Sequence, residues 1–116
     1  MKIIISDNVK ISIKDIFNYL ARFSTKYASK TVENIYEKIV SIKDAPYIGR
    51  YVLELPDKQF RERIYKEYRI IYYISEINKT IYIQYIISGK QNSNLFFEVH
   101  KNEILRFLNQ TLFKSF

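Results

Sequence analysis

The chain has 116 residues, of which 19 are Lys or Arg and 12 are Asp or Glu, so its formal net charge is +7. This length suits one domain over residues 1–116, and a hydrophobic content of 47% is typical of a folded chain. The sequence has no cysteine and a single histidine, His100, which excludes disulfide scaffolds, zinc fingers and cysteine nucleophiles. The positive charge favours an acidic or polyanionic partner.

Segments that would direct the chain to a membrane are not expected. The longest apolar stretches, such as Ile70–Ile74, are too short to span a bilayer. Only Ile3–Ile5 precede the polar residues Ser6–Asn8, so we expect no secretory signal, no membrane partner and a cytoplasmic protein. No group of acidic residues has metal-ligand spacing, and we expect neither a metal nor a cofactor.

The N-terminal part of the chain predicts a strand and then a helix. Residues 2–5 form a short β-branched run, which favours a strand. Apolar residues then recur every three or four positions across residues 9–20, which indicates one face of a helix. Ser6 or Asp7 is expected to cap this helix at its N-terminus.

A second helical pattern covers residues 28–40, after a break at Ser24-Thr25. This helix should end near Asp44, because Pro46 disfavours helical geometry in the residue before it. The two helices are expected to pack along one apolar seam as an αα-hairpin.

Beyond the turn at residues 46–50 the apolar period changes from that of a helix to that of a strand. Strands are predicted at residues 52–55, 61–65, 68–75 and 80–87. The three longer runs have short connections and predict an antiparallel meander, with the helices covering one face. A helical tail, interrupted around His100–Asn102, completes an α+β fold in the order strand, helix, helix, three strands, helix.

The most informative charges lie in the segment that joins the first two strands of this meander. Arg61, Arg63 and Tyr65 alternate along one strand and therefore share one face. Arg69 is expected close to them on the neighbouring strand. Guanidinium groups on a sheet face can hold phosphates, and tyrosine rings can stack on bases.

A less specific interpretation is equally compatible with these residues. The arginines would then belong to a solvated surface on which they are neutralised by Glu54, Glu62 and Glu67. If the basic surface instead binds a target or a nucleic acid, three further residues extend it, namely Arg50, Lys66 and Lys90.

Four motifs in order along the chain carry a family resemblance. They are Lys14-Asp15-Ile16-x-x-Tyr19-Leu20, Pro46-x-x-Gly49-Arg50, Arg61-Glu62 and Tyr68-Arg69-Ile70-Ile71-Tyr72. With this order and spacing, the chain resembles the RelE/ParE superfamily of toxins from type II toxin–antitoxin modules. The resemblance implies a protein that arrests growth when free of a cognate acidic antitoxin, with which it forms a hetero-oligomer.

The superfamily implies two alternative targets. ParE-like members poison DNA gyrase. RelE-like members cleave mRNA on the ribosome without a metal, by attack of the ribose 2′-OH on the adjacent phosphate. The Pro46–Arg50 turn after a long helical hairpin favours the ParE-like branch.

The RelE-like alternative assigns catalytic roles to three arginines of this chain. By resemblance, Arg61 and Arg63 would contact RNA phosphate, and Arg69 would stabilise the charge that develops on it. However, the chain has Gln91 where RelE-like enzymes place an arginine, and Phe97 where they place a proton-transferring tyrosine. We therefore expect a gyrase inhibitor, with a ribosome-dependent mRNA endoribonuclease as the alternative and an inactive binding module as a second alternative.

An apolar stripe in the tail is formed by Leu105, Leu108 and Leu112. It either packs within the protein itself or forms part of a groove that binds the antitoxin.

Overall fold

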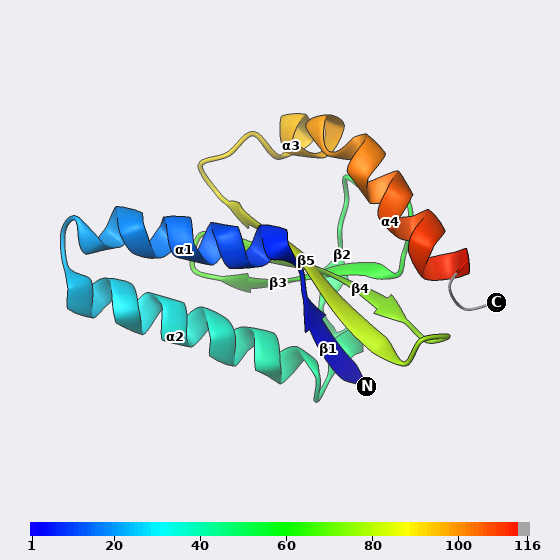
Figure 1. The fold of residues 1–116 in the computed structure, drawn as a ribbon, viewed down its shortest axis with the longest axis horizontal. Coiled ribbons are helices and arrows are strands. Elements are labelled where there is room, and N and C mark those ends of the chain that lie inside the picture. Colours follow the sequence, from blue (N-terminus) through cyan, green and yellow to red (C-terminus); the bar gives the residue numbers. More distant parts are fainter. Residues whose placement is uncertain (114–116) are drawn as a thin grey trace.

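The computed structural model describes residues 1–113 and has an α+β fold, in which one five-stranded sheet lies between two pairs of helices (Figure 1). Its elements in chain order are β1 (Lys2–Ile5), α1 (Asp7–Ala21), α2 (Thr25–Ile42), the short 3-10 helix η1 (Pro46–Ile48), β2 (Arg50–Tyr51), β3 (Phe60–Tyr65), β4 (Tyr68–Ser75), β5 (Thr80–Ser88), α3 (Ser93–Val99) and α4 (Lys101–Phe113). The predicted fold class is confirmed.

Serine side chains begin both helices of the N-terminal helical hairpin. The Oγ atoms of Ser6 and Ser24 each accept a hydrogen bond from the backbone N–H three positions later, at 3.2 and 3.1 Å. Each bond satisfies a donor that the first turn of a helix leaves unpaired. The cap predicted at Ser6 or Asp7 is therefore Ser6, and α2 ends at Ile42, slightly before the predicted end near Asp44.

The sheet has the strand order β1-β5-β4-β3-β2. Strands β3, β4 and β5 form the predicted antiparallel meander, whereas β1 pairs with β5 in parallel, with Ile3 opposite Ile81. The first strand thus closes one edge of a mixed sheet, directly beside the last strand of the meander (Figure 1).

The strand predicted at residues 52–55 is wrong. Strand β2 is shorter and lies earlier, where Arg50 pairs with Glu62 and Tyr51 with Arg61. After these two residues the backbone N–H of Leu55 donates to the carbonyl oxygen of Val52 at 3.1 Å and closes a turn. The turn buries the Val52 side chain, which accounts for the apolar residue at this position.

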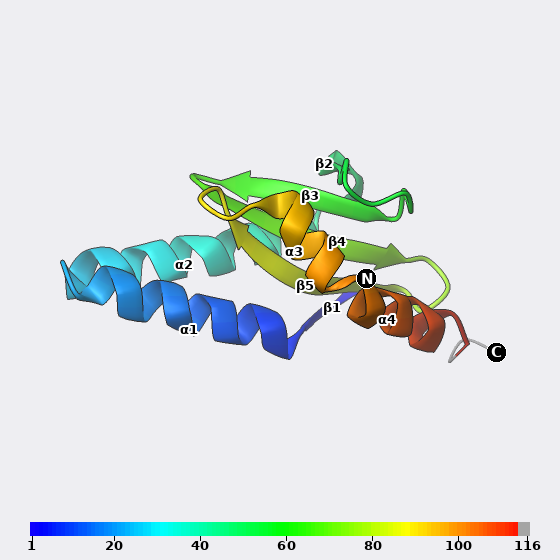
Figure 2. The same cartoon turned by 90° about the horizontal axis from the view of Figure 1, so that it is seen from above.

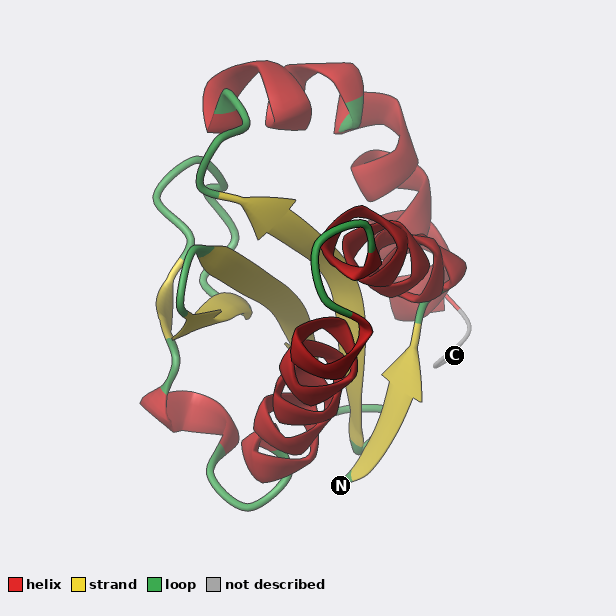
Figure 3. Ribbon diagram, turned by 90° about the vertical axis from the view of Figure 1, so that its left-hand side faces the viewer, coloured by secondary structure: helices red, strands yellow, loops and turns green. Residues whose placement is uncertain are grey.

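Helices α1 and α2 cover one face of the sheet, and α3 and α4 lie against the other (Figures 2 and 3). An apolar core forms on each face. The buried residues of the first core, under the helical hairpin, include Val9, Ile13, Ile35, Ile39, Ile42, Ile70, Tyr72, Ile74, Ile81 and Ile83. The second core, under α3 and α4, contains Val52, Phe60, Ile71, Tyr73, Tyr85, Ile87, Phe97 and Ile104. Helices therefore cover both faces of β4, although the sequence predicted a cover for only one.

Besides their apolar contacts in the second core, the C-terminal helices make partly buried polar contacts through Glu103 of α4. Glu103 Oε1 accepts hydrogen bonds from the Tyr85 hydroxyl at 2.5 Å and from Asn8 Nδ2 at 2.7 Å. These bonds join α4 to β5 and to α1. The tail is divided into α3 and α4 at His100, which confirms the interruption predicted there.

None of the helices within residues 1–113 combines the length and the apolar character that crossing a membrane requires.

Candidate functional site

Four charged side chains form a cluster on the sheet face that α3 and α4 cover, and we call it the charge cluster. Arg69 lies at its centre, with Nε at 2.7 Å from Glu62 Oε2 and Nη1 at 2.7 Å from Glu54 Oε2. Arg69 Nη2 donates to Glu54 Oε1 at 2.9 Å, and Arg50 Nε donates to Glu62 Oε1 at 3.0 Å. Three of the four side chains are largely buried, with exposed fractions of 17% for Arg69, 14% for Glu54 and 3% for Glu62, whereas Arg50 is 67% exposed.

Strand pairing explains why these residues meet. Glu62 lies opposite Arg50 on one neighbouring strand, and residues directly opposite each other point to the same face. Arg69 lies opposite Ile64, which shares a face with Glu62 because side chains alternate along β3. Glu54 approaches from the turn after β2, so the cluster fastens this turn to the central sheet.

Ion pairing changes the titration of the charge cluster. Hydrogen bonds from the Arg69 guanidinium lower the pKa of Glu54 from 4.5 to about 2, against the opposing effect of burial, and the Ser93 side chain adds to the lowering. The same contacts with Glu54, and then Glu62, raise the pKa of Arg69. Both groups are therefore charged throughout the physiological pH range.

This pairing predicts a loss of stability in acid. The pKa of Glu54 is about 2 in the folded state and 4.5 in the unfolded state. The ionised carboxylate therefore contributes its full share of folding stability above pH 4.5, and this contribution is lost as pH falls toward 2. We expect this contribution to be about 2 kcal/mol. Urea unfolding of the wild type and Glu54→Gln at pH 7 and in steps down to pH 2 measures it, as a difference in stability that shrinks in acid.

Glu67→Gln is the matched control, because Glu67 is exposed and forms no ion pair with any residue from 1 to 113. It should keep the acid dependence of the wild type. A difference between wild type and Glu54→Gln that stayed constant down to pH 2 would contradict the role assigned to this carboxylate.

The charge cluster leaves Arg69 poorly suited to bind phosphate. Its Nε, Nη1 and Nη2 atoms all donate to carboxylate oxygens. A phosphate would have to displace Glu54 or Glu62, and the remaining carboxylate would repel it. The less specific interpretation was correct for Glu54 and Glu62, which do neutralise arginines, but the contacts are buried rather than solvated.

The predicted grouping of Arg69 with the other arginines is wrong. Arg61, Arg63 and Tyr65 do share one face of β3, as predicted, but Arg69 lies on the opposite face. The reason is that Tyr65 pairs with Tyr68 across the turn, so the next residue, Arg69, points away from them. No single face of the β3–β4 hairpin carries the three arginines.

Arg61 is held between two tyrosine rings. Its guanidinium carbon lies 5.3 Å from the ring centroid of Tyr47 and 4.4 Å from that of Tyr51. Nη1 donates to the carbonyl oxygens of Tyr47 and Gly49, at 2.9 and 3.0 Å. Arg61 thus stabilises the turn between α2 and β2. Tyr47 and Tyr51, which lie on either side of Gly49 in the sequence, are the signal from which this contact could be predicted.

The remaining predicted basic residues do not converge on one point. Arg63 is half-buried and forms no ion pair with any residue from 1 to 113. Lys66 Nζ donates to the Tyr27 hydroxyl at 3.2 Å, at the turn between β3 and β4. Lys90 is exposed in the loop after β5, whereas Tyr65 accepts a hydrogen bond from Asn34 Nδ2 of α2 at 2.9 Å.

The two positions that depart from the RelE-like pattern have structural roles. Phe97 is buried in the second core, with its ring 6.0 Å from the guanidinium carbon of Arg69. Gln91 Oε1 accepts a hydrogen bond from the backbone N–H of Ser88 at 2.8 Å and closes the loop after β5. His100 stacks on Phe96 at 4.1 Å between centroids. Of these three residues, Phe97 lies beside an arginine, Arg69, and that arginine is already paired with Glu54 and Glu62.

A groove of ≈ 460 Å³ lies between the turn after β2 and the helices α3 and α4. Leu105 and Leu108 line it, together with Leu55 and Phe60, whereas the exposed Leu112 lies outside its lining. The predicted leucine stripe is thus divided between this groove and the surface. The charged residues that line it are Glu54, Asp57, Glu98 and Lys101.

Within residues 1–113, no three His, Cys, Asp or Glu side chains are placed to hold a metal ion. The charge cluster pairs its own acids and bases, and the groove is mainly apolar.

Comparison with known proteins places the chain in a family of small toxins. The model of the family described as "ParE toxin of type II toxin-antitoxin system, parDE" matches residues 3–93, and the chain therefore belongs to this family. A solved structure titled "Chromosomal ParDE TA system from P. aeruginosa" contains a chain of similar fold, with a TM-score of 0.64 and 15% sequence identity. The match covers 78% of this chain and 97% of that one. No curated protein sequence matches the chain.

The family match ends at Ser93, the first residue of α3. Helices α3 and α4 thus lie almost entirely beyond the matched segment, although they supply Phe97 and Ile104 to the second core.

Proposed function

We propose that this toxin inhibits DNA gyrase in the cytoplasm when it is free of its antitoxin. The observation that carries the proposal is the double pairing of Arg69 with Glu54 and Glu62, at 2.7 Å in each case. This arginine is the one that the RelE-like alternative needs at the scissile phosphate. Its carboxylate partners favour the ParE-like branch of the superfamily, to which the family match also points.

Proton transfer gives a second argument against RNA cleavage. Attack by a 2′-OH requires one group to remove a proton and another to protonate the leaving oxygen. Phe97 has no titratable proton and is packed in the second core. The loss of such a group reduces the rate by about two to four orders of magnitude.

The two activities can be separated with the purified toxin. Gyrase is assayed for supercoiling of relaxed plasmid, and ribosomes translating a defined transcript are assayed for mRNA cleavage. We expect supercoiling to be inhibited while the transcript stays intact. Intact supercoiling with a cut transcript would instead establish the endoribonuclease, and neither activity, with normal growth on expression, would establish the inactive binding module.

The antitoxin is proposed to place an apolar segment in the groove beside α4. Leu105 and Leu108 offer apolar surface there. Apart from Glu54, which Arg69 neutralises, the charged residues lining the groove are the acids Asp57 and Glu98 and the base Lys101, so this groove does not attract an acidic segment. The acidic part of the antitoxin would then contact the toxin elsewhere in the hetero-oligomer. Leu112, which is exposed outside the groove, would lie at the edge of this interface.

A further inference from the structure

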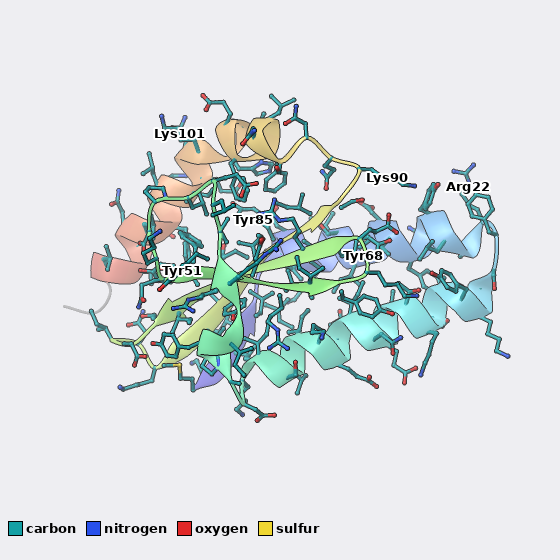
Figure 4. All side chains as sticks on the ribbon, turned by 180° about the vertical axis from the view of Figure 1, so that it is seen from behind. Arg22, Tyr51, Tyr68, Tyr85, Lys90 and Lys101 are labelled. Atoms are coloured by element: carbon teal, nitrogen blue, oxygen red, sulfur yellow. The ribbon has the colours of Figure 1, made fainter. Side chains whose placement is uncertain are left out.

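The free end of the helical hairpin carries an exposed group of aromatic and basic side chains, which we call the hairpin tip. It consists of Tyr19, Arg22, Phe23, Lys26 and Tyr27. The exposed fractions of Tyr19, Phe23 and Tyr27 are 51%, 73% and 49%. The hairpin extends past the end of the sheet, and Figure 4 shows Arg22 at its far end (Figures 1 and 4).

The side chains of the hairpin tip are arranged against one another. The rings of Tyr19 and Phe23 meet edge to face at 5.7 Å, and the guanidinium carbon of Arg22 lies 5.8 Å from each ring centroid. On the other side of the tip, Lys66 Nζ lies 5.0 Å from the ring centroid of Tyr27. These contacts restrict the side chains before any partner binds, which lowers the entropy lost on association.

Folding alone does not account for these residues. Burying one large apolar side chain contributes about 1.5–3 kcal/mol, and Phe23 forgoes most of that contribution. The first core is built from other residues, and none of the five tip residues belongs to it. Tyrosine and arginine are also the residues that most often dominate binding energy in protein interfaces.

Charge indicates the kind of partner. The segment from residue 16 to residue 32 contains Arg22, Lys26 and Lys30 and no Asp or Glu. Lys30 forms an exposed ion pair with Glu33 at 3.6 Å, whereas Arg22 and Lys26 form none with any residue from 1 to 113. Asp15 and Glu67 line a depression with Tyr19 at the base of the tip. The outer end of the hairpin is therefore uniformly basic and complements an acidic surface.

Shape favours a protein over a nucleic acid. Proteins that bind single strands combine a basic groove with open aromatic faces on which bases stack. The hairpin tip is instead a projection, and Arg22 and Lys66 already lie near its rings. A projection of this kind fits into a concavity in its partner.

We propose that the hairpin tip is a docking surface for a concave, acidic surface of a protein partner. In the proposed function this partner is the toxin's target, and the inference rests on that function to this extent. The tip is separate from the groove beside α4, which is lined by other residues. Antitoxin and target would thus occupy different parts of the toxin.

Two matched double variants test this surface. Phe23→Ser with Lys26→Glu alters the hairpin tip, and Val40→Ser with Lys43→Glu makes the same kinds of change at the other end of α2. All four residues are exposed, so both proteins should fold, and their net charges are equal. Fluorescently labelled polyglutamate serves as an acidic probe, with an oligo(dT) strand as the nucleic-acid probe.

We expect the tip variant to bind polyglutamate about tenfold more weakly than the control variant does. It should also lose growth arrest and inhibition of supercoiling, while the control keeps both. Equal polyglutamate binding by the two variants would overturn the proposal, as would a larger effect of the tip variant on oligo(dT). A wild type that neither arrests growth nor inhibits gyrase would refute the proposed function, and the polyglutamate comparison would still decide the docking surface.

Discussion

Arg69→Ala is expected to lower the free energy of unfolding by about 3–5 kcal/mol, because it removes the central partner of two largely buried carboxylates. Glu62 is almost fully buried and keeps only its contact with Arg50, at 3.0 Å. Glu54 loses both of its hydrogen bonds to the guanidinium. Urea unfolding at pH 7, followed by circular dichroism, measures the change.

Arg63→Ala is the control for Arg69→Ala. Arg63 lies on the adjacent part of the hairpin but on the opposite face, and it forms no ion pair with any residue from 1 to 113. Its removal should cost less than about 1 kcal/mol. Adding Glu54→Gln and Glu62→Gln to Arg69→Ala should recover part of the stability, because the uncompensated charges are then absent.

The same variants bear on function. If Arg69→Ala has wild-type stability but does not arrest growth, the arginine acts on a target, and the endoribonuclease interpretation returns. If it is unstable, as we expect, its loss of toxicity carries no information about catalysis. Arg69 is then important because it fastens the turn that contains Glu54 to the sheet.

The sequence contained enough information to place Arg69 on the correct face. The strands predicted at residues 61–65 and 68–75 leave Lys66 and Glu67 for the turn, and the backbone of Lys66 has a positive φ of 52°. A two-residue turn pairs Tyr65 with Tyr68, and paired residues share a face. Arg69 must then point away from Arg61 and Arg63. The prediction applied the alternation of side chains within the first strand and did not carry it across the turn to Arg69.

Other features lie beyond local pattern. The apolar periodicity predicted each long element, because period reports which face of an element is buried. It did not show that β1 would join β5 or that α3 and α4 would cover the second face, because these are contacts between distant segments. Glu54 could not be assigned to a buried pair, since its position depends on the turn that replaces the strand predicted at residues 52–55.

Gly49→Ala is expected to lower the free energy of unfolding by about 3 kcal/mol, through overpacking and the loss of a hydrogen bond. A Cβ atom at this position would lie 2.1 Å from the hydroxyl oxygen of Tyr72 and 2.9 Å from the carbonyl oxygen of Glu62. Tyr72 is fully buried, and its hydroxyl donates to the carbonyl oxygen of Pro46 at 2.5 Å. The expected loss is measured by urea unfolding.

The clash, and not the backbone conformation, is the cause of this loss. Gly49 has φ −59° and ψ 146°, which alanine adopts without strain. Tyr72→Phe removes the nearest atom. The loss of stability in the Gly49→Ala, Tyr72→Phe double variant should therefore be smaller, by about 1 kcal/mol, than the sum of the losses in the two single variants. Gly89→Ala, where a Cβ would lie 3.2 Å from the carbonyl oxygen of Glu67 near the surface, should cost less than Gly49→Ala.

Full additivity of Gly49→Ala and Tyr72→Phe would show that Tyr72 is not the obstacle. Coupling between the two substitutions would show that the glycine of the Pro46-x-x-Gly49-Arg50 motif is needed to make room for Tyr72. The glycine lets the Tyr72 hydroxyl reach Pro46 and brings its own carbonyl oxygen within 3.0 Å of Arg61 Nη1. The chain then enters β2 with Arg50 facing Glu62, so one small residue positions both arginine contacts at this edge of the sheet.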